Sequence, residues 1–407
     1  MMTPRPAART PLRVALLGLG TVGSAVAREL LERGGHITRA TGGRPIHLVT
    51  VGVRDPDRPR AVVLPRTIAR SADLSAVATD ASVDVVVELL GGLDPAGELI
   101  SVALAGGRSV ITANKALLAR RGAELEAEAR RSGASLRFEA AVGGGIPVLS
   151  PLAADLAINR WTAVSGIVNG TTNFMLTAMT EAGWDYAAAL ADAQARGYAE
   201  ADPSGDVEAR DAADKLAILV RLAFGGWPDV TGIRRRPPAV DGDGSPGITG
   251  VTAVAIAAAA KLGLVIKLVA RASRGTGDGV AAAVTPAVVP TGSPLGRSGG
   301  VTNVVELEGE PIGRVRFSGL GAGAQATSSA VLGDLVAVAR GIGSTWAGLP
   351  APAAAAVAAD PLDGERRWFY LLPDGAGFLT APASLDLVRA ELRATGVNGA
   401  LYPFFEA

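Results

Sequence analysis

A glycine-rich turn between an apolar segment and an amphipathic one most constrains the fold of this chain. The apolar part of Arg13–Gly23 predicts a β-strand, and the residues that follow, through about Leu31, predict a helix. Gly18, Gly20 and Gly23 fit G-x-G-x-x-G, with one glycine each for a tight turn, close approach to a pyrophosphate and close helix packing. The helix N-terminus would then face the phosphate charge. The sequence predicts a dinucleotide site, and a purely structural glycine turn is the alternative.

Further strands and helices alternate after this turn. The apolar segments predict strands, and the stretches between them have helical periodicity. This alternation is typical of a parallel, doubly wound α/β sheet, which binds ligands at the carboxyl ends of its strands. The predicted strands are Ile46–Val53, Val83–Leu90, Arg108–Thr112 and Leu136–Val142, and the helices between them include 98–105 and 116–131.

The end of the second strand bears on the choice of cofactor. NAD enzymes usually place an acid there for the ribose 2′-hydroxyl, whereas an arginine suits a 2′-phosphate. Arg54 occupies the position, and Asp55 follows it. We therefore expect NADP, with NAD left open by Asp55. The alternative to a phosphate contact is that these arginines only solvate a surface loop.

Lysine is scarce in this chain, and two of its lysines lie in segments that predict ligand sites. Only Lys115, Lys215, Lys261 and Lys267 occur. Lys115 lies at the first position of a predicted helix, where its positive charge is unfavourable next to the helix dipole. We therefore favour a ligand-binding role for Lys115 over that of a surface lysine that binds nothing. Six carboxylates lie between Gly197 and Lys215.

Lys215 is a candidate for proton transfer. A lysine can give up its proton in a partly buried site, whereas an arginine cannot. Asp211 lies one helical turn before it, on the same face. The alternative is a surface ion pair of small energetic value.

Composition excludes several classes of function. The chain has 407 residues, no formal net charge, no cysteine and two histidines. We therefore expect no thiolate chemistry and no nucleic-acid partner. No apolar run is long enough to cross a membrane. Residues 1–10 lack the apolar core of a signal peptide, so we expect a disordered arm and a cytoplasmic protein.

The chain resembles the homoserine dehydrogenase family, which interconverts aspartate 4-semialdehyde and homoserine with NAD(P). The resemblance extends from about Leu12 to Arg340. It rests on ordered motifs: GLGTVG, VVELLGG, TANKALLA, FEAAVGGGIPV, GIVNGTTNFML, GYAEADPSGDVEARDAADKLAIL, LGLVIKLVARA and GLGAGAQATSSAVLGDL.

The resemblance implies roles for individual residues. Lys215 would be the general acid that protonates the semialdehyde oxygen, and Lys115 would assist. Glu200 and Asp211 would hold the substrate, with Asp206 nearby. A helix N-cap is the alternative for Asp206, because it precedes Val207 at a predicted helix start.

The resemblance also implies cofactor, metal and subunit contacts. It implies a monovalent cation, usually sodium, that is bound largely by main-chain carbonyls; a buried glutamate capping a loop is the alternative. It implies a homodimer formed through the middle domain. The implied cofactor contacts are Gly18, Gly20, Thr21, Val22, Gly23, Arg54, Thr112, Lys115, Gly197 and Gly323, and the implied cation ligands are Glu139, Val142, Gly144 and Ile146.

We expect a Rossmann-type domain, a second α+β domain for catalysis and dimerisation, and a short extension. The expected divisions are 11–148, 149–320, a helix returning to the first domain at 321–341, and 342–407. Residues 347–359 predict an Ala/Pro-rich linker, followed by a strand at 366–372 and a helix at 385–394. About 45 residues follow the linker, which is too few for the four strands and two helices of a whole regulatory ACT domain.

Two other functions stay open on the sequence. One is a Rossmann oxidoreductase for another small polar carbonyl. The other is an inactive NADP-binding regulator, although the joint presence of Lys115, Lys215, Glu200 and Asp211 argues against it.

Overall fold

The computed structural model divides into two compact units. The first unit is Met1–Ala157 with Ala322–Ala351, and the second is Ile158–Gly321 with Pro352–Ala407. The structure describes residues 9–275, 279–354, 357–359, 362, 364–396 and 399–406, so residues 1–8 of the predicted arm lie outside the described residues. Within this described part, no helix has the length and apolarity to cross a membrane.

A parallel sheet forms the centre of the first unit, as the alternating pattern predicts. Its strand order is β3-β2-β1-β4-β5-β6, and the order reverses between β1 and β4. Leu17 pairs with Gly52 on one side and with Glu88 on the other, so the ends of three strands meet at the reversal point. The strands are β1 Leu12–Leu17, β2 Ile46–Gly52, β3 Ala69–Ser71, β4 Val85–Glu88, β5 Ser109–Thr112 and β6 Leu136–Arg137.

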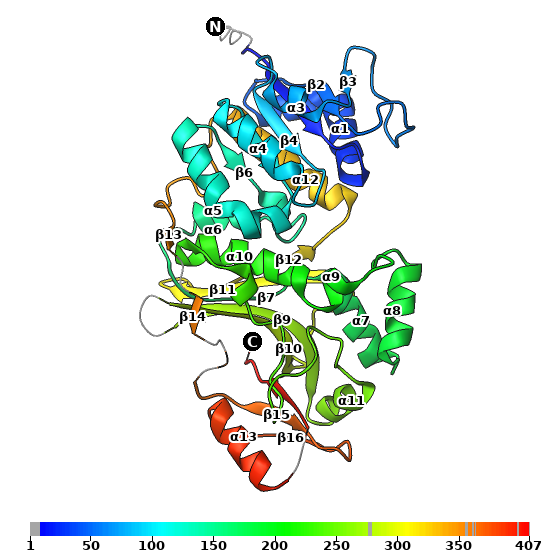
Figure 1. Ribbon diagram of the computed structural model, residues 1–407, viewed down its shortest axis with the longest axis vertical. Coiled ribbons are helices and arrows are strands. Elements are labelled where there is room, and N and C mark those ends of the chain that lie inside the picture. The colour runs from blue at the N-terminus through cyan, green and yellow to red at the C-terminus, as the bar shows by residue number, and fades with distance from the viewer. Residues whose placement is uncertain are drawn as a thin grey trace, which may run out of the picture. The chain divides into compact units, whose positions relative to one another are not determined.

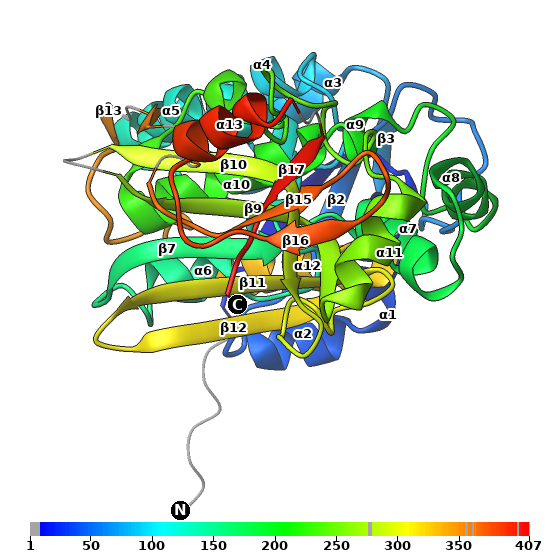
Figure 2. The same ribbon diagram turned by 90° about the horizontal axis from the view of Figure 1, so that it is seen from below.

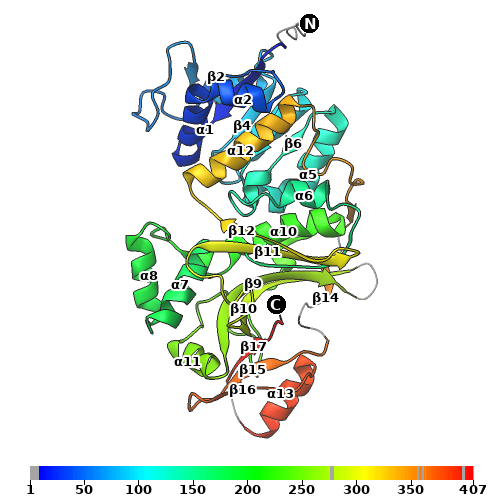
Figure 3. The ribbon, with the colours of Figure 1, turned by 180° about the vertical axis from the view of Figure 1, so that it is seen from behind.

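Helices cover both faces of this sheet. In Figure 1, α3, α4 and α5 lie on the near face, and the view from behind in Figure 3 shows α1, α2 and α12 on the other. Val331 and Leu335 of α12 are buried in the same core as β1 and α1. The helices are α1 Thr21–Glu32, α2 Gly34–Ala40, α3 Leu74–Thr79, α4 Ala96–Ala105, α5 Lys115–Ser132, α6 Leu149–Ala153 and α12 Ala324–Ala339.

The strand predicted at Leu136–Val142 is wrong beyond its start. β6 ends at Arg137, and Glu139–Ala141 forms a 3₁₀ turn. The main-chain N–H of Glu139 donates to Asp334 of α12 at 2.9 Å, which draws the chain out of the sheet.

The second unit is built on a largely antiparallel sheet. The strand order is β12-β11-β7-β9-β10-β14, and the antiparallel pair β9 and β10 runs in register from Leu264 with Pro290 to Arg274 with Val280. Helix α10 is buried along most of its length and lies on one face (Figure 1). The strands are β7 Arg160–Ile167, β8 Gly226–Trp227, β9 Leu264–Arg274, β10 Val280–Pro290, β11 Thr302–Glu310 and β12 Gly313–Leu320; the helices are α7 Gly170–Glu181, α8 Tyr186–Ala195, α9 Ser204–Val207, α10 Arg210–Phe224 and α11 Ala253–Lys261.

The C-terminal residues add a small sheet on the other face of the large one (Figure 2). This sheet has the order β16-β15-β17, and α13 packs on it. The strand predicted at 366–372 is present as β15, and the helix predicted at 385–394 is present as α13. The elements are β15 Trp368–Leu371, β16 Gly377–Leu379, β17 Ala400–Pro403 and α13 Leu385–Ala394.

The segment predicted as a linker contributes to two sheets. β13, Ala353–Ala354, pairs with β8, and β14, Val357–Ala359, pairs in parallel with β10. Main-chain hydrogen bonds supply this pairing, so the Ala/Pro composition that suggested a linker does not prevent it.

Candidate functional site

The glycine turn after β1 has the close approaches that its sequence predicts. Gly18 has φ of 100°, and a Cβ there would lie 2.7 Å from the Leu89 carbonyl oxygen. A Cβ on Gly23 would lie 2.2 Å from the Gly18 carbonyl oxygen. A Cβ on Gly20 would meet nothing within 4 Å, so the main chain at Gly20 is open to a ligand group. Thr21 and Val22 begin α1 beside it.

The ends of β4 and β5 are joined by a buried carboxylate that we did not predict as a site residue. Glu88 accepts from the hydroxyl of Thr112 at 2.6 Å and from the N–H of Leu90 at 2.7 Å. Burial raises the pKa of Glu88, against the lowering effect of these donors. Asn114 caps α5 by accepting from Leu117 N and donates to the Gly92 carbonyl. Its only sequence signal is its place before a helix start.

Lys115 is half-buried at the first position of α5, one residue after Asn114. The Glu88–Thr112 contact and the Asn114 cap together fix the chain that leads to it. The predicted cofactor contact Thr112 is fully buried, and its hydroxyl is engaged within the protein. Thr112 therefore exposes no surface to a ligand in this conformation.

The residues after β2 carry the side chains on which the predicted choice of cofactor depends. Arg54 is exposed, directly after the buried Val53. Asp55 uses its carboxylate to accept the main-chain N–H groups of Asp57 and Arg58, each at 3.1 Å. This turn occupies one oxygen of the carboxylate that would otherwise accept from a ribose hydroxyl.

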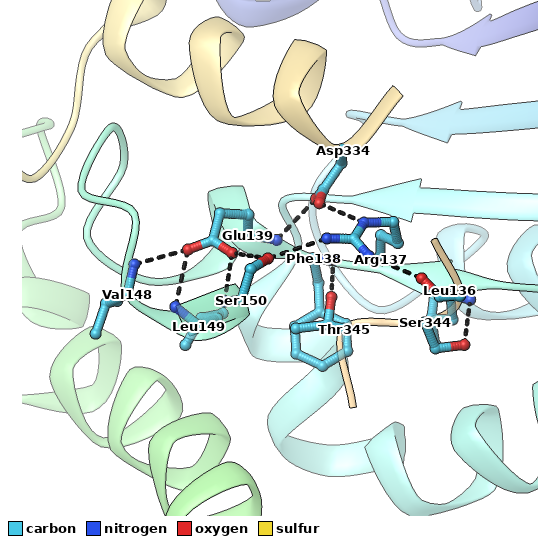
Figure 4. A network of polar contacts seen from close by, with 11 residues as sticks. Leu136, Arg137, Phe138, Glu139, Val148, Leu149, Ser150, Asp334, Ser344 and Thr345 are labelled. Carbon is cyan, nitrogen blue, oxygen red and sulfur yellow. Dashed lines mark hydrogen bonds and ion pairs between the residues drawn. The ribbon is translucent and has the colours of Figure 1, made fainter. Parts of the chain in front are cut away.

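Glu139, the first predicted cation ligand, uses its carboxylate to cap α6 (Figure 4). One oxygen accepts from the N–H groups of Val148 and Leu149, both at 2.8 Å, and the other from the N–H of Ser150 at 2.7 Å and its hydroxyl at 2.5 Å. The side chain of Glu139 therefore has the capping role that was the alternative to cation binding. Hydrogen-bond donors occupy both oxygens of its carboxylate, so a cation at this turn would bind main-chain carbonyls instead.

A buried ion pair holds the same turn in place. Arg137 donates to Asp334 at 2.7 Å, to the Gly343 carbonyl at 2.7 Å and to the Ser150 hydroxyl at 3.0 Å (Figure 4). Val142, Gly144 and Ile146 are buried in the loop that follows Glu139, and Gly144 has φ of 57°. Gly323 has φ of 111° and precedes α12 in the same unit.

Lys215 is held in the second unit by two oxygens. Its Nζ donates to Asp211 Oδ2 at 2.6 Å and to the Val168 carbonyl at 2.7 Å. The side chains of Lys215 and Asp211 are 10% and 14% exposed, so the surface ion pair considered for them is wrong. The predicted one-turn spacing on a shared helix face is confirmed.

Asn169 joins this pair to Asp206, and the sequence did not reveal it. Its Nδ2 donates to Asp206 Oδ1 at 2.7 Å and to Asp211 Oδ2 at 2.8 Å, while its Oδ1 caps α7 at Thr172 N. Asp206 lies inside α9, so the N-cap alternative for it is wrong. We call Asn169, Asp206, Asp211 and Lys215 the carboxylate cluster.

Burial raises the pKa of Asp206, and the charge of Asp211 adds to this effect. The Asn169 amide and Lys215 act in the opposite direction. Ala209 turns the chain between α9 and α10 with φ of 64°, a conformation that costs about 1 kcal/mol or more for a non-glycine residue. This turn lets Asp206 and Asp211 approach one amide from two helices.

Glu200 and Gly197 lie near the start of the same segment. Glu200 is exposed, and among the described residues its carboxylate is not bonded to the carboxylate cluster. Its main-chain carbonyl accepts from Gln194, and the neighbouring Tyr198 carbonyl accepts from Thr171 of α7 at 2.8 Å. Gly197 has φ of 74° and ends the turn after α8. The predicted site residues therefore divide between the two units.

Comparisons with known proteins match the chain to two family models. A family model described as the NAD binding domain of homoserine dehydrogenase matches residues 18–139, and one described as homoserine dehydrogenase matches residues 147–336. A homoserine dehydrogenase of Synechocystis sp. is 44% identical over 328 residues, which cover 80% of this chain and 72% of that protein. One of Corynebacterium glutamicum is 43% identical over 331 residues, with the same coverage.

Solved structures extend the likeness to the C-terminal residues. The crystal structure of a homoserine dehydrogenase from Thiobacillus denitrificans superposes with a TM-score of 0.86 and 31% identity, covering 97% of this chain and 98% of that one.

Proposed function

Because the chain belongs to the homoserine dehydrogenase family, we propose that Lys215 is the acid–base residue of its reaction. That reaction is the NAD(P)-dependent interconversion of L-aspartate 4-semialdehyde and L-homoserine, a step of amino-acid biosynthesis that leads to threonine, methionine and isoleucine. The observation that supports the proposal is the buried Lys215 Nζ, 2.6 Å from Asp211 and 2.7 Å from the Val168 carbonyl.

Lys215 has the chemistry that both directions need. In reduction, hydride adds to the aldehyde carbon, and the ammonium gives its proton to the carbonyl oxygen as negative charge develops there. In oxidation, the neutral amine takes the proton of the homoserine hydroxyl. Asp211 and the Val168 carbonyl accept two of the three donors of Nζ, which leaves one for the substrate oxygen.

The carboxylates around Lys215 suit an amino-acid substrate. We assign the substrate ammonium to Asp211 and Asp206, with exposed Glu200 reaching it from its loop. A carboxylate binds an ammonium best when ionised, and the Asn169 amide favours the ionised form of Asp206. Lys115, at the start of α5, would contact cofactor and substrate.

We assign NADP as the preferred cofactor, bound at the turn Gly18–Gly23 with Gly197 and Gly323 as further contacts. When bound, it supplies or accepts the hydride. Exposed Arg54 would pair with a 2′-phosphate, whereas one carboxylate oxygen of Asp55 is already engaged by its own turn. NAD would lack that ion pair.

The monovalent cation that the resemblance implies would bind the main chain of the turn after β6. The carboxylate of Glu139 accepts four hydrogen bonds, so the carbonyls of Glu139, Val142, Gly144 and Ile146 would bind the ion. Hard oxygen ligands of this kind suit sodium. The cation, the homodimer and the cytoplasmic location stay predictions.

The test is oxidation of L-homoserine by the purified protein with NADP⁺, followed by NADPH absorbance, beside Lys215→Ala. We expect turnover in the wild type and a loss of roughly 100-fold or more in the variant, because general acid–base groups contribute this much. Lys261→Ala is the control, since Lys261 is exposed on α11. Full turnover in Lys215→Ala would remove the proton-transfer role from this residue.

A further inference from the structure

The second unit contains another buried lysine, Lys267 on the central strand β9. Lys267 is 2% exposed, and its Nζ donates to Asn173 Oδ1 at 3.0 Å and to the Ser298 carbonyl at 2.7 Å. Among the described residues, no carboxylate oxygen lies within ion-pair distance of it; the nearest acidic influence is that of exposed Glu181. A buried ammonium without a counter-ion is unfavourable, so a lysine at this position must have a role that offsets the cost.

Lys267 fixes the orientation of one amide. Asn173 directs its Nδ2 to the carbonyls of Ser298 and Thr302, both at 3.1 Å, and its Oδ1 to Lys267. A lysine Nζ has only donors, so it determines which end of the Asn173 amide faces it. Burial lowers the pKa of Lys267 to about 8, but the neutral amine can still donate to both oxygens.

Asn173 and Asn169 lie one turn apart on α7. The main-chain N–H of Asn173 donates to the carbonyl of Asn169, and the Asn169 side chain donates to Asp206 and Asp211. Thr171, between them, holds the Tyr198 carbonyl. The first turn of α7 therefore connects every segment of the carboxylate cluster to the contacts that Lys267 makes.

We propose that Lys267 is a positioning residue for the reaction, which acts through Asn173 and the first turn of α7 to place Asn169 against Asp206 and Asp211. This inference rests on the proposed role of Lys215. A shift of Asn169 changes the separation of Asp211 from Lys215, and displacements of about 1 Å at a reacting centre can cost roughly 100-fold in rate.

The test uses full-length Lys267→Met, which keeps the stem of the side chain and removes the donors. We expect kcat for homoserine oxidation to fall about tenfold or more, the pH dependence of kcat to shift, and KM for NADP⁺ to stay unchanged. Lys261→Met, the exposed lysine of α11, should keep wild-type kinetics. A lysine that only stabilised the fold would lower the melting temperature and leave the pH profile of kcat in place.

Wild-type kcat and an unshifted profile in Lys267→Met would overturn the proposal. Should Lys267→Met fail to fold, Asn173→Asp replaces it: this change keeps an oxygen for Lys267 but removes the donors to Ser298 and Thr302, and it should lower kcat in the same way. Unchanged kcat there would equally overturn the proposal. Full activity in Lys215→Ala would instead refute the proposed function, whereas an inactive Lys215→Ala beside a fully active Lys267→Met refutes only the role of Lys267.

Discussion

At the scale of residues, one amide separates two carboxylates that would otherwise repel each other. Asn169 donates to Asp206 and to Asp211 with the two hydrogens of a single Nδ2. The amide lowers the pKa of Asp206, while burial and the charge of Asp211 raise it. The amide therefore opposes the effect of burial on this carboxylate, in the site that we propose for the substrate ammonium.

We therefore expect Asn169→Ala to change the acidic limb of the pH profile. Without the amide, the pKa of Asp206 rises further. Activity that needs ionised Asp206 is lost as the pH falls through that pKa, so the acidic limb of kcat/KM should move to higher pH. At neutral pH, kcat/KM for homoserine should fall by roughly tenfold.

Thr180→Ala is the control for that measurement, because Thr180 lies at the other end of α7 and its hydroxyl donates to the Leu176 carbonyl of the same helix. An acidic limb that stays in place in Asn169→Ala would show that Asp206 is not the group that titrates.

The residue scale also shows where sequence reasoning stops. Asp211 and Lys215 are four residues apart, so helix geometry alone predicts their contact. Asn169 lies 37 and 42 residues before its two partners, and Glu88 lies 24 residues before Thr112. No local periodicity encodes such separations, because they depend on how strands and helices pack. The sequence predicted the segment that contains Asp211 and Lys215, but it did not predict the Asn169 amide that joins this segment to Asp206.

At the scale of elements, the strand after α5 ends early because Glu139 forms hydrogen bonds outside the sheet. The segment from Leu136 predicts a strand through Val142, but the Glu139 carboxylate caps α6 and the Glu139 main-chain N–H donates to Asp334 (Figure 4). Alternation of apolar residues cannot show this, since the competing contacts come from α6 and α12. The other strands and helices that the sequence predicted in the first unit are present within a few residues of their expected bounds.

Replacing Glu139 by glutamine should destabilise the first unit. A glutamine has one acceptor oxygen, and its amide hydrogens would face the N–H groups of α6. We expect a loss of about 2 to 3 kcal/mol in the free energy of unfolding, the usual cost of an unsatisfied buried donor at a charged partner. Denaturant titration measures it, with Glu98→Gln as control because the Glu98 carboxylate is 70% exposed. Equal stability of both variants would contradict the capping role.

At the scale of the whole molecule, the C-terminal residues belong to the second unit. The strand β14 extends the large sheet by pairing with β10, and Arg389 of α13 donates to the Ala239 carbonyl at 2.9 Å. Phe405 packs on the apolar face of the large sheet. The sequence predicted β15 and α13 from local patterns, but it treated the residues before them as a linker, because an Ala/Pro-rich segment has no periodicity that indicates a partner strand.

We expect the small C-terminal sheet to stabilise the second unit through one shared core. Trp368 and Tyr370 of β15 are fully buried with Val388 of α13 and Val240, a residue from the loop after β8. Trp368→Ala removes the largest of these side chains, and large-to-small changes of this kind cost about 3 to 5 kcal/mol. Because Val240 comes from the body of the unit, unfolding should remain one cooperative transition with a lower midpoint, measured by calorimetry. Leu387→Ala is the control and should have little effect, since Leu387 of α13 is 52% exposed. Two separate transitions in Trp368→Ala would mean that the C-terminal sheet unfolds independently, and its packing on the loop would then contribute little to the stability of the unit that holds Lys215.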